Sequence, residues 1–132
     1  MQVYSDELGL TRSTWRNQHG RTASQHLSTA RDIASLFIAL KRDFPDYFNL
    51  FRRKSEDASM RQVKNSASRL LIAIPGITGA KYGYTRAAGF NAAVSVKRRG
   101  REVIVVVFGA RSTVSLVRRI ERLTDLGFKK VN

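Results

Sequence analysis

The stretch GFNAAVSVKRRGREVIVVVFGA, residues 89–110, constrains the fold of this chain more than any other. Two runs rich in β-branched and aromatic residues, 90–97 and 102–108, flank a turn that contains Gly100, which is the pattern of a β-hairpin. Within the second run, residues 103–107 read Val-Ile-Val-Val-Val and are apolar on both faces. Because such a strand needs cover on both sides, the sequence predicts a sheet with other elements packed on each face.

A helix is predicted upstream, in the segment STARDIASLFIALKRDF at residues 28–44. Ser28 or Thr29 can cap its N-terminus. Asp32 falls in the first turn, where the helix dipole favours an acid, and Pro45 ends the helix. Its apolar residues recur at helical spacing and form one face: Ile33, Leu36, Phe37 and Leu40.

The last segment, 112–126, also has a helical pattern. Ser112 can cap this helix, and Gly127 is expected to end it. One face carries Leu116, Ile120 and Leu123. Residues 2–8 are expected to form a short helix, and 53–68 to be polar and irregular with short extended pieces. The fold class is therefore α+β, with helices first, then a three-stranded antiparallel sheet (about 80–84, 90–97 and 102–108), and then helix 112–126 on one face of that sheet.

Charge is the one unusual feature of the composition. Lys and Arg number 24 against 10 Asp and Glu, a formal net charge of +14. Such a chain is attracted to polyanions: nucleic acid, anionic lipid or acidic cell-wall polymers. The basic residues are spread along the chain, however, and their clusters lie in four separate segments, 52–54, 97–101, 118–122 and 129–130. Spread charge is typical of a solvated surface, so the charge alone does not favour nucleic-acid binding as the role of the chain.

Four segments resemble one known family. Residues 75–110 read PGITGAKYGYTRAAGFNAAVSVKRRGREVIVVVFGA. This segment is similar to the one that carries the third active-site motif of the D-alanyl-D-alanine carboxypeptidases. These are low-molecular-weight penicillin-binding proteins of peptidase family S11 with a serine β-lactamase-like fold. Three further segments resemble parts of the family sequence that precede this motif, in the same order: ELGLTRSTWRNQHG, HLSTARDIASLFIALKRDFPDYFNLF and NSASRLL. The resemblance implies a β-lactamase/transpeptidase-like fold and an ancestry in the removal of terminal D-alanine from peptidoglycan stem peptides.

The resemblance places Lys81, Tyr82 and Gly83 at the family's Lys-Thr-Gly positions, on a strand at one wall of the cleft. In the family, the lysine supplies positive charge, the threonine hydroxyl binds the substrate carboxylate, and the glycine leaves room for the substrate backbone. Tyr82 departs from this pattern: its hydroxyl lies farther from the backbone, and its ring could fill the cleft. Thr85 is a neighbouring candidate, so the implied substrate-binding set is Lys81, Tyr82, Gly83 and Thr85.

The family's nucleophile motif is absent from the sequence. The mechanism is acyl transfer by a serine that is activated by a lysine in Ser-x-x-Lys. A similar spacing that ends in arginine instead of lysine, Ser-x-x-Arg, begins at Ser13, Ser28, Ser66 and Ser115. Arginine does not release its proton near neutral pH, so it cannot act as the base. Ser-x-Asn, the second motif, is also absent. We therefore expect residues 1–132 to be a single domain that corresponds to the C-terminal portion of the family's domain, lacks the nucleophile half and has no catalytic residue.

Two functions remain open for such a chain. The first is a carboxypeptidase-family chain that is inactive alone. The second is a non-catalytic binding module for peptidoglycan, for a partner chain or, less favoured, for nucleic acid. In the family fold, strand 103–108 pairs with a strand from the nucleophile half, so here it would be an exposed edge. We therefore expect a homodimer through strand 103–108 or through an exchanged helix.

Other sites find little support. His19 and His26 are the only histidines and form no His-x-x-x-His pair, so no metal and no cofactor are expected. The chain has no cysteine, no Gly-x-Ser-x-Gly and no phosphate-binding loop. No apolar run approaches the length of a membrane span, and MQVYSDELGL does not resemble a secretion signal, although the family is exported to the periplasm or cell envelope.

Overall fold

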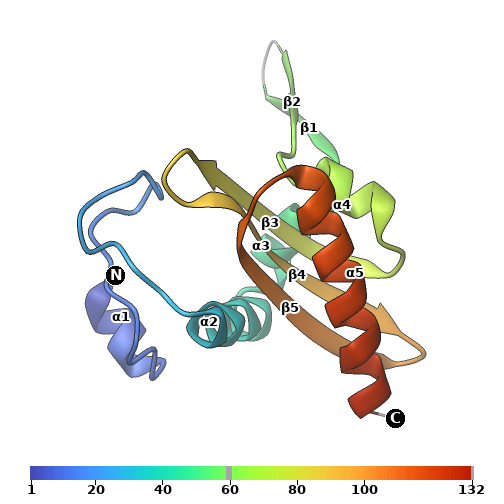
Figure 1. Cartoon of the computed structure of the whole chain (residues 1–132), viewed down its shortest axis with the longest axis horizontal. Helices are drawn as coiled ribbons and strands as arrows, with labels where there is room; N and C mark the ends of the chain where they lie inside the picture. The colour runs from blue at the N-terminus through green and yellow to red at the C-terminus, as the bar shows by residue number, and fades with distance from the viewer. Residues whose placement is uncertain (59–60, 132) are drawn as a thin grey trace.

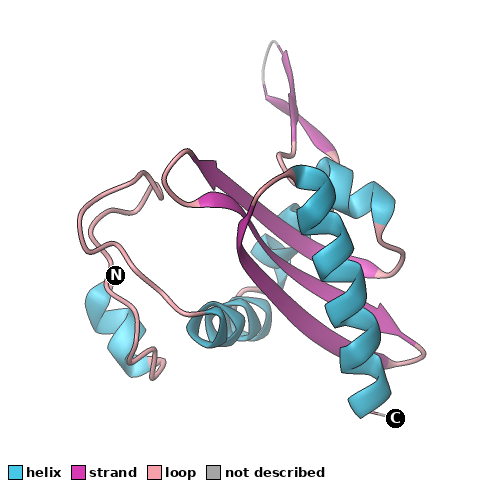
Figure 2. Cartoon of the chain, in the orientation of Figure 1, coloured by secondary structure: helices cyan, strands magenta, loops and turns pink. Residues whose placement is uncertain are grey.

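The computed structural model describes residues 1–58 and 61–131, and the chain is α+β (Figures 1 and 2). The helices are α1 (Gln2–Glu7), α2 (Ala30–Asp43), α3 (Pro45–Phe48), the 3₁₀ helix η1 (Asn49–Arg52), α4 (Ser68–Ala73) and α5 (Thr113–Lys130). The strands are β1 (Ser55–Ala58), β2 (Arg61–Lys64), β3 (Ile77–Thr85), β4 (Gly89–Arg98) and β5 (Arg101–Ala110). Each helix in this part of the chain is too short or too polar to cross a lipid bilayer.

The three longer strands form an antiparallel sheet in the order β3-β4-β5. This confirms the predicted sheet, although each strand extends beyond its predicted bounds. The sheet crosses the middle of the molecule, with α5 against one face and α2 on the other side (Figure 1). The prediction that strand 103–107 is covered on both faces is thus confirmed. Among the described residues, β5 pairs only with β4 and β3 only with β4, so both are edge strands.

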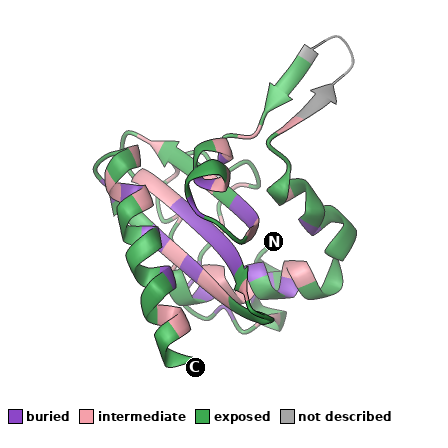
Figure 3. Ribbon diagram, turned by 90° about the vertical axis from the view of Figure 1, so that its right-hand side faces the viewer, coloured by how far each residue is buried: buried purple, intermediate pink, exposed green. Residues whose placement is uncertain are grey.

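The larger core lies between the sheet and α5. Val94 and Val96 of β4, with Val105 and Val107 of β5, alternate along their strands and face the helix. From α5, Leu116 and Ile120 complete this core, and both are fully buried. Figure 3 shows the buried residues gathered along the strands, while much of the helix surface is exposed.

The structure differs from the prediction at the end of α5. Gly127 lies inside the helix, which continues to Lys130. A Cβ atom at Gly127 would lie 2.5 Å from Cγ1 of Val103, so the missing side chain lets the helix lie close to β5. Leu123 was predicted to share the buried face but is 42% exposed. Thr124 is buried in its place, because the contact face is centred on Ile120 and continues to Gly127.

The second core lies between the sheet and the α2 side. Phe37 of α2 and Phe48 of α3 pack edge to face, with ring centroids 5.0 Å apart, against Ala93 of β4. As predicted, Thr29 caps α2, because its Oγ1 accepts a hydrogen bond from the backbone N–H of Asp32 (3.1 Å). α2 ends at Asp43, and Pro45 begins α3 after one intervening residue, Phe44.

The loop between α1 and α2 is tied to the start of α2. The Asp32 carboxylate accepts hydrogen bonds from the backbone N–H of Arg12 (2.9 Å) and from Ser13 Oγ (2.7 Å). An isolated antiparallel bridge joins Thr14 to Leu27 and closes the loop between them. These contacts hold residues 19–27 in place beside the sheet.

Candidate functional site

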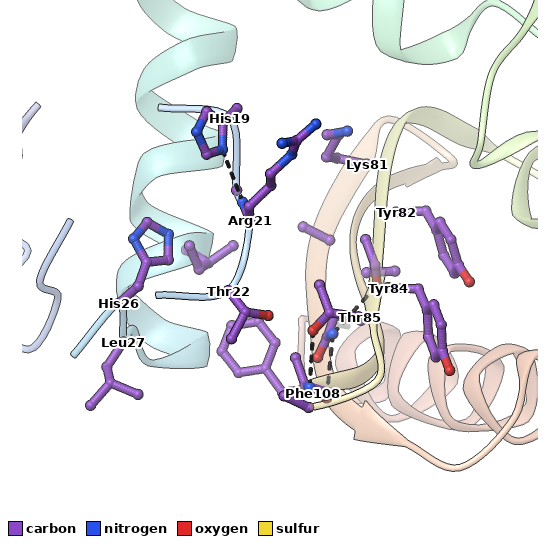
Figure 4. A pocket seen from close by; sticks show the side chains of 18 of the residues that line it. His19, Arg21, Thr22, His26, Leu27, Lys81, Tyr82, Tyr84, Thr85 and Phe108 are labelled. Atoms are coloured by element: carbon purple, nitrogen blue, oxygen red, sulfur yellow. Dashed lines mark hydrogen bonds between the residues drawn. The ribbon is translucent and has the colours of Figure 1, made fainter. Parts of the chain in front are cut away.

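A cavity of about 680 Å³ lies between this loop and the sheet (Figure 4). One wall is the loop, which contributes His19, Arg21, Thr22, His26 and Leu27. The facing wall is β3 and β4, which contribute residues 81–85 and 91–93. All four residues that the resemblance implies for substrate binding, Lys81, Tyr82, Gly83 and Thr85, therefore lie around one cavity.

Lys81 is the cation of the strand wall. Its side chain is exposed and has no hydrogen-bond or ion-pair partner among the described residues. In Figure 4 it extends from β3 toward the Arg21 side chain, which reaches across from the loop. Two cations that line one cavity favour an anionic ligand between them.

Tyr82 lies on the same strand, but its ring points to the other side. Figure 4 shows the Lys81 and Tyr82 side chains on opposite sides of β3. The Tyr82 ring packs against the α5-side core, with its centroid 6.4 Å from that of Phe90. The Tyr84 ring points the same way, and its centroid lies 4.5 Å from that of the Phe90 ring. The ring of Tyr82 therefore does not fill the cavity, because the alternation of a strand turns it toward the opposite face.

Gly83 and Thr85 differ in how accessible they are. A Cβ atom at Gly83 would have nothing within 4 Å, so this part of β3 is open to a ligand. Thr85 Oγ1 accepts a hydrogen bond from the backbone N–H of Ala88 (3.1 Å), which closes the turn between β3 and β4. Thr85 thus has a structural bond at the turn, while Gly83 leaves space.

The two histidines lie on the loop wall as hydrogen-bond acceptors. His26 Nδ1 accepts from the backbone N–H of Arg16 (2.9 Å), and His19 Nδ1 accepts from that of Arg21 (3.3 Å). Within residues 1–58 and 61–131 there is no group of three or more His, Asp or Glu side chains that could hold a metal ion. The histidine contacts shape the loop and help to present Arg21.

Arg21 is the charged residue of the described lining that the sequence did not single out. It follows Gly20 in a polar loop and belongs to no motif of its own. Arg21 lies opposite Lys81 only because the loop packs against the start of α2, and this packing depends on tertiary structure. Its signal in the sequence is limited to its position beside the family-like segment ELGLTRSTWRNQHG.

The described lining contains cations, apolar and aromatic side chains, and hydroxyl and amide groups, but neither a serine nor a carboxylate. Lys81 and Arg21 can attract an anion, and the open edge of β3 beside Gly83 can offer backbone groups to an extended ligand. The described lining residues therefore supply binding groups but no serine nucleophile.

Comparison with known proteins identifies the family. The model of the family D-alanyl-D-alanine carboxypeptidase, peptidase S11, matches residues 1–112. The chain belongs to the D-alanyl-D-alanine carboxypeptidase family. It is 32% identical over 129 residues to D-alanyl-D-alanine carboxypeptidase DacC of Escherichia coli K12, covering 98% of this chain and 32% of that protein.

Solved structures show the same fold. Penicillin-binding protein D2 from Listeria monocytogenes, solved with cefotaxime bound, matches with a TM-score of 0.87 and 24% identity over 96% of this chain and 53% of that chain. The Streptomyces K15 DD-transpeptidase matches with a TM-score of 0.89 and 21% identity over 97% of this chain and 52% of that one. This chain thus spans about half the length of these structures and about a third of DacC.

Proposed function

We propose that this chain forms the substrate-side wall of a D-alanyl-D-alanine carboxypeptidase site and, by itself, binds a D-alanyl peptide without being acylated by it. The observation that carries this proposal is Lys81, a cation that has no partner among the described residues. It lies in a cavity whose described lining contains no acid, at a position that the family resemblance assigns to substrate binding. A peptidoglycan stem peptide ends in a carboxylate, which is the group that such a site attracts.

The geometry supports a particular arrangement of the ligand. The terminal carboxylate would lie between Lys81 and Arg21, which approach each other from the two walls. The peptide backbone would run along the free edge of β3, where Gly83 leaves space. A β-lactam carries a comparable carboxylate, so penicillins are expected to bind reversibly in the same place.

The absence of acylation follows from the chemistry of the sequence. Acyl transfer in this family needs a serine hydroxyl and a lysine amine on one helix face, and the sequence contains no Ser-x-x-Lys. No serine lies in the described lining of the cavity. We therefore propose that residues 1–132 act as one binding domain and that turnover requires a nucleophile from another polypeptide segment.

Binding of a capped D-alanyl-D-alanine peptide, measured by isothermal titration calorimetry, tests this function. Lys81→Ala is expected to weaken binding about tenfold or more, since it removes a charge-assisted contact. Lys54→Ala is the matched control, because Lys54 is exposed and does not line the cavity. Equal affinity of Lys81→Ala and the unmodified chain would contradict the binding site, and covalent labelling by a fluorescent penicillin would contradict the absence of acylation.

The free edge of β5 supports a second part of the proposal, a homodimer. Ten residues, Arg101–Ala110, form an edge strand whose outer backbone groups pair with no other described strand. Such an edge favours pairing with another strand, and a second copy of this chain offers the same edge. We propose pairing through 103–108. Exchange of a helix between two copies is the competing arrangement of the dimer.

The less favoured alternative function is binding of nucleic acid by charge alone. It would give an affinity for nucleic acid that falls steeply as the salt concentration rises.

A further inference from the structure

The turn between β4 and β5 has an unusual conformation for its sequence. Arg98 pairs with Arg101, and the two residues between them, Arg99 and Gly100, have positive φ values of 49° and 78°. A two-residue hairpin turn with both φ values positive favours Asn-Gly or Gly-Gly. A long side chain in the left-handed region is uncommon, and such strained residues often serve a function. Arg99 thus occupies a position where asparagine would fit better.

A hollow of about 450 Å³ lies beside this turn, lined by Arg98, Arg99, Arg101 and Phe128. Two of the arginines are fixed by α5 and its end. Arg98 Nη1 lies 3.0 Å from Oδ1 of Asp125, and its guanidinium lies 5.3 Å from the centroid of the Phe128 ring. Arg101 Nη1 donates to the carbonyl oxygen of Val131 (2.5 Å). The third, Arg99, is exposed and has no hydrogen-bond or ion-pair partner among the described residues.

More positive charge gathers at the same end of the molecule. Lys129 and Lys130 lie in the last turn of α5, which ends beside this hairpin, and Lys97 precedes the turn (Figure 1). Asp125 contacts the cluster through Arg98. Exposed apolar side chains lie near the same end of the helix, with Leu126 44% and Val131 45% exposed. The end of the molecule therefore combines concentrated cations with apolar surface.

We propose that this hollow is a phosphate-binding site that takes the headgroup of an anionic phospholipid, with Arg99 as the principal contact. A guanidinium donates paired hydrogen bonds that match phosphate oxygens. Basic side chains beside apolar ones are typical of surfaces that rest on anionic membranes. A nucleic acid would instead favour a stripe of cations along one face, whereas this cluster is confined to one end. The site is separate from the Lys81 cavity and does not depend on the peptide-binding proposal.

Sedimentation of the chain with lipid vesicles tests this site at physiological ionic strength. The chain is expected to sediment with vesicles of phosphatidylglycerol mixed with phosphatidylcholine and not with phosphatidylcholine alone. Arg99→Asn should weaken this binding at least about fivefold, the effect of one basic side chain near an anionic surface. The same variant should keep or raise the thermal midpoint, because asparagine suits the left-handed conformation, so a loss of binding cannot be ascribed to unfolding.

Arg86→Asn is the matched control, since Arg86 also lies in a hairpin turn but at the opposite end of the sheet. It removes the same charge and should weaken vesicle binding less than about twofold. Equal losses for Arg99→Asn and Arg86→Asn would overturn the site, because they would indicate diffuse attraction by net charge. Failure of the unmodified chain to bind the anionic vesicles would also overturn it. Arg99-dependent binding to single-stranded DNA without vesicle binding would overturn the lipid assignment.

Discussion

Lys41 of α2 forms an ion pair with Glu102 of β5, a residue 61 positions away in the sequence. The same carboxylate accepts hydrogen bonds from Ser95 Oγ of β4 (2.5 Å) and from Thr78 Oγ1 of β3 (3.1 Å). One side chain thus joins α2 to all three strands of the sheet. Because α2 also anchors the loop that carries Arg21, this contact supports the wall of the Lys81 cavity.

Glu102→Gln is expected to destabilise the chain by about 1–2 kcal/mol, because a charge-assisted contact is lost while the partly exposed site limits the loss. The buried Ser95 hydroxyl can still donate to the amide oxygen, so the fold should persist. A decrease of roughly 4 °C in the thermal midpoint per kcal/mol is expected for a domain of this size. Calorimetry checks this, and an unchanged midpoint would contradict a role for Glu102 in joining the layers.

The thermal stability of the chain should decrease in acid, partly because the Glu102 carboxylate becomes protonated. Burial raises the pKa of Glu102, but hydrogen bonds from Lys41 and Ser95 outweigh burial and hold it below the ordinary value of 4.5. A carboxyl group whose pKa is lower in the folded chain stabilises the fold above its unfolded pKa, and this stabilisation is lost as the pH falls through the folded pKa. The thermal midpoint of the unmodified chain should therefore decrease below about pH 4.5, and that of Glu102→Gln should decrease less. Parallel curves for the two proteins would contradict this assignment.

Two glycines of β3 give a matched pair of substitutions. A Cβ atom at Gly79 would lie 2.7 Å from the Phe48 ring, whereas one at Gly83 would meet nothing within 4 Å. Gly79→Ala should therefore destabilise the chain by about 1–3 kcal/mol, and Gly83→Ala should leave stability nearly unchanged. Denaturant unfolding measures both. If Gly83→Ala weakens peptide binding without loss of stability, the ligand passes where we place it; unchanged binding would count against that path.

Much of this fold could be predicted from local pattern. The Val103–Val107 run predicted a strand, because a short run of consecutive β-branched apolar residues is typical of a strand covered on both faces. The spacing around Phe37 and Ile120 predicted helices, because burial of one helix face imposes a period of 3.6 residues. The helix α4 was not predicted, since an apolar run of five residues, Leu70–Ile74, fits strand and helix equally well. Within the candidate site, the family resemblance indicated Lys81 and Gly83. Arg21 could not be predicted, because it reaches the cavity only through the packing of a loop that has no periodic pattern.

Tyr82→Thr would restore the family's Lys-Thr-Gly sequence at residues 81–83. We expect it to destabilise the chain by about 1–2 kcal/mol, since the ring packs against the α5-side core near Phe90. Because that ring lies on the side of β3 opposite Lys81, its removal should not enlarge the cavity. Chemical denaturation and peptide titration separate the two effects. A large gain in peptide affinity would show that the ring covers the site in solution.

The proposed homodimer should depend on salt in a characteristic direction. Each copy carries a formal charge of +14, so two copies repel each other, and added salt should strengthen their association by screening that repulsion. Sedimentation equilibrium at low and high ionic strength measures this.

Phe108→Lys should abolish the dimer, because a charge on an edge strand opposes strand pairing, and Phe108 is already 42% exposed. Val114→Lys, 61% exposed on α5, adds the same charge away from the edge and should leave the dimer intact. A dimer that survives Phe108→Lys would instead indicate an exchanged helix, and a monomer at every salt concentration would contradict self-association.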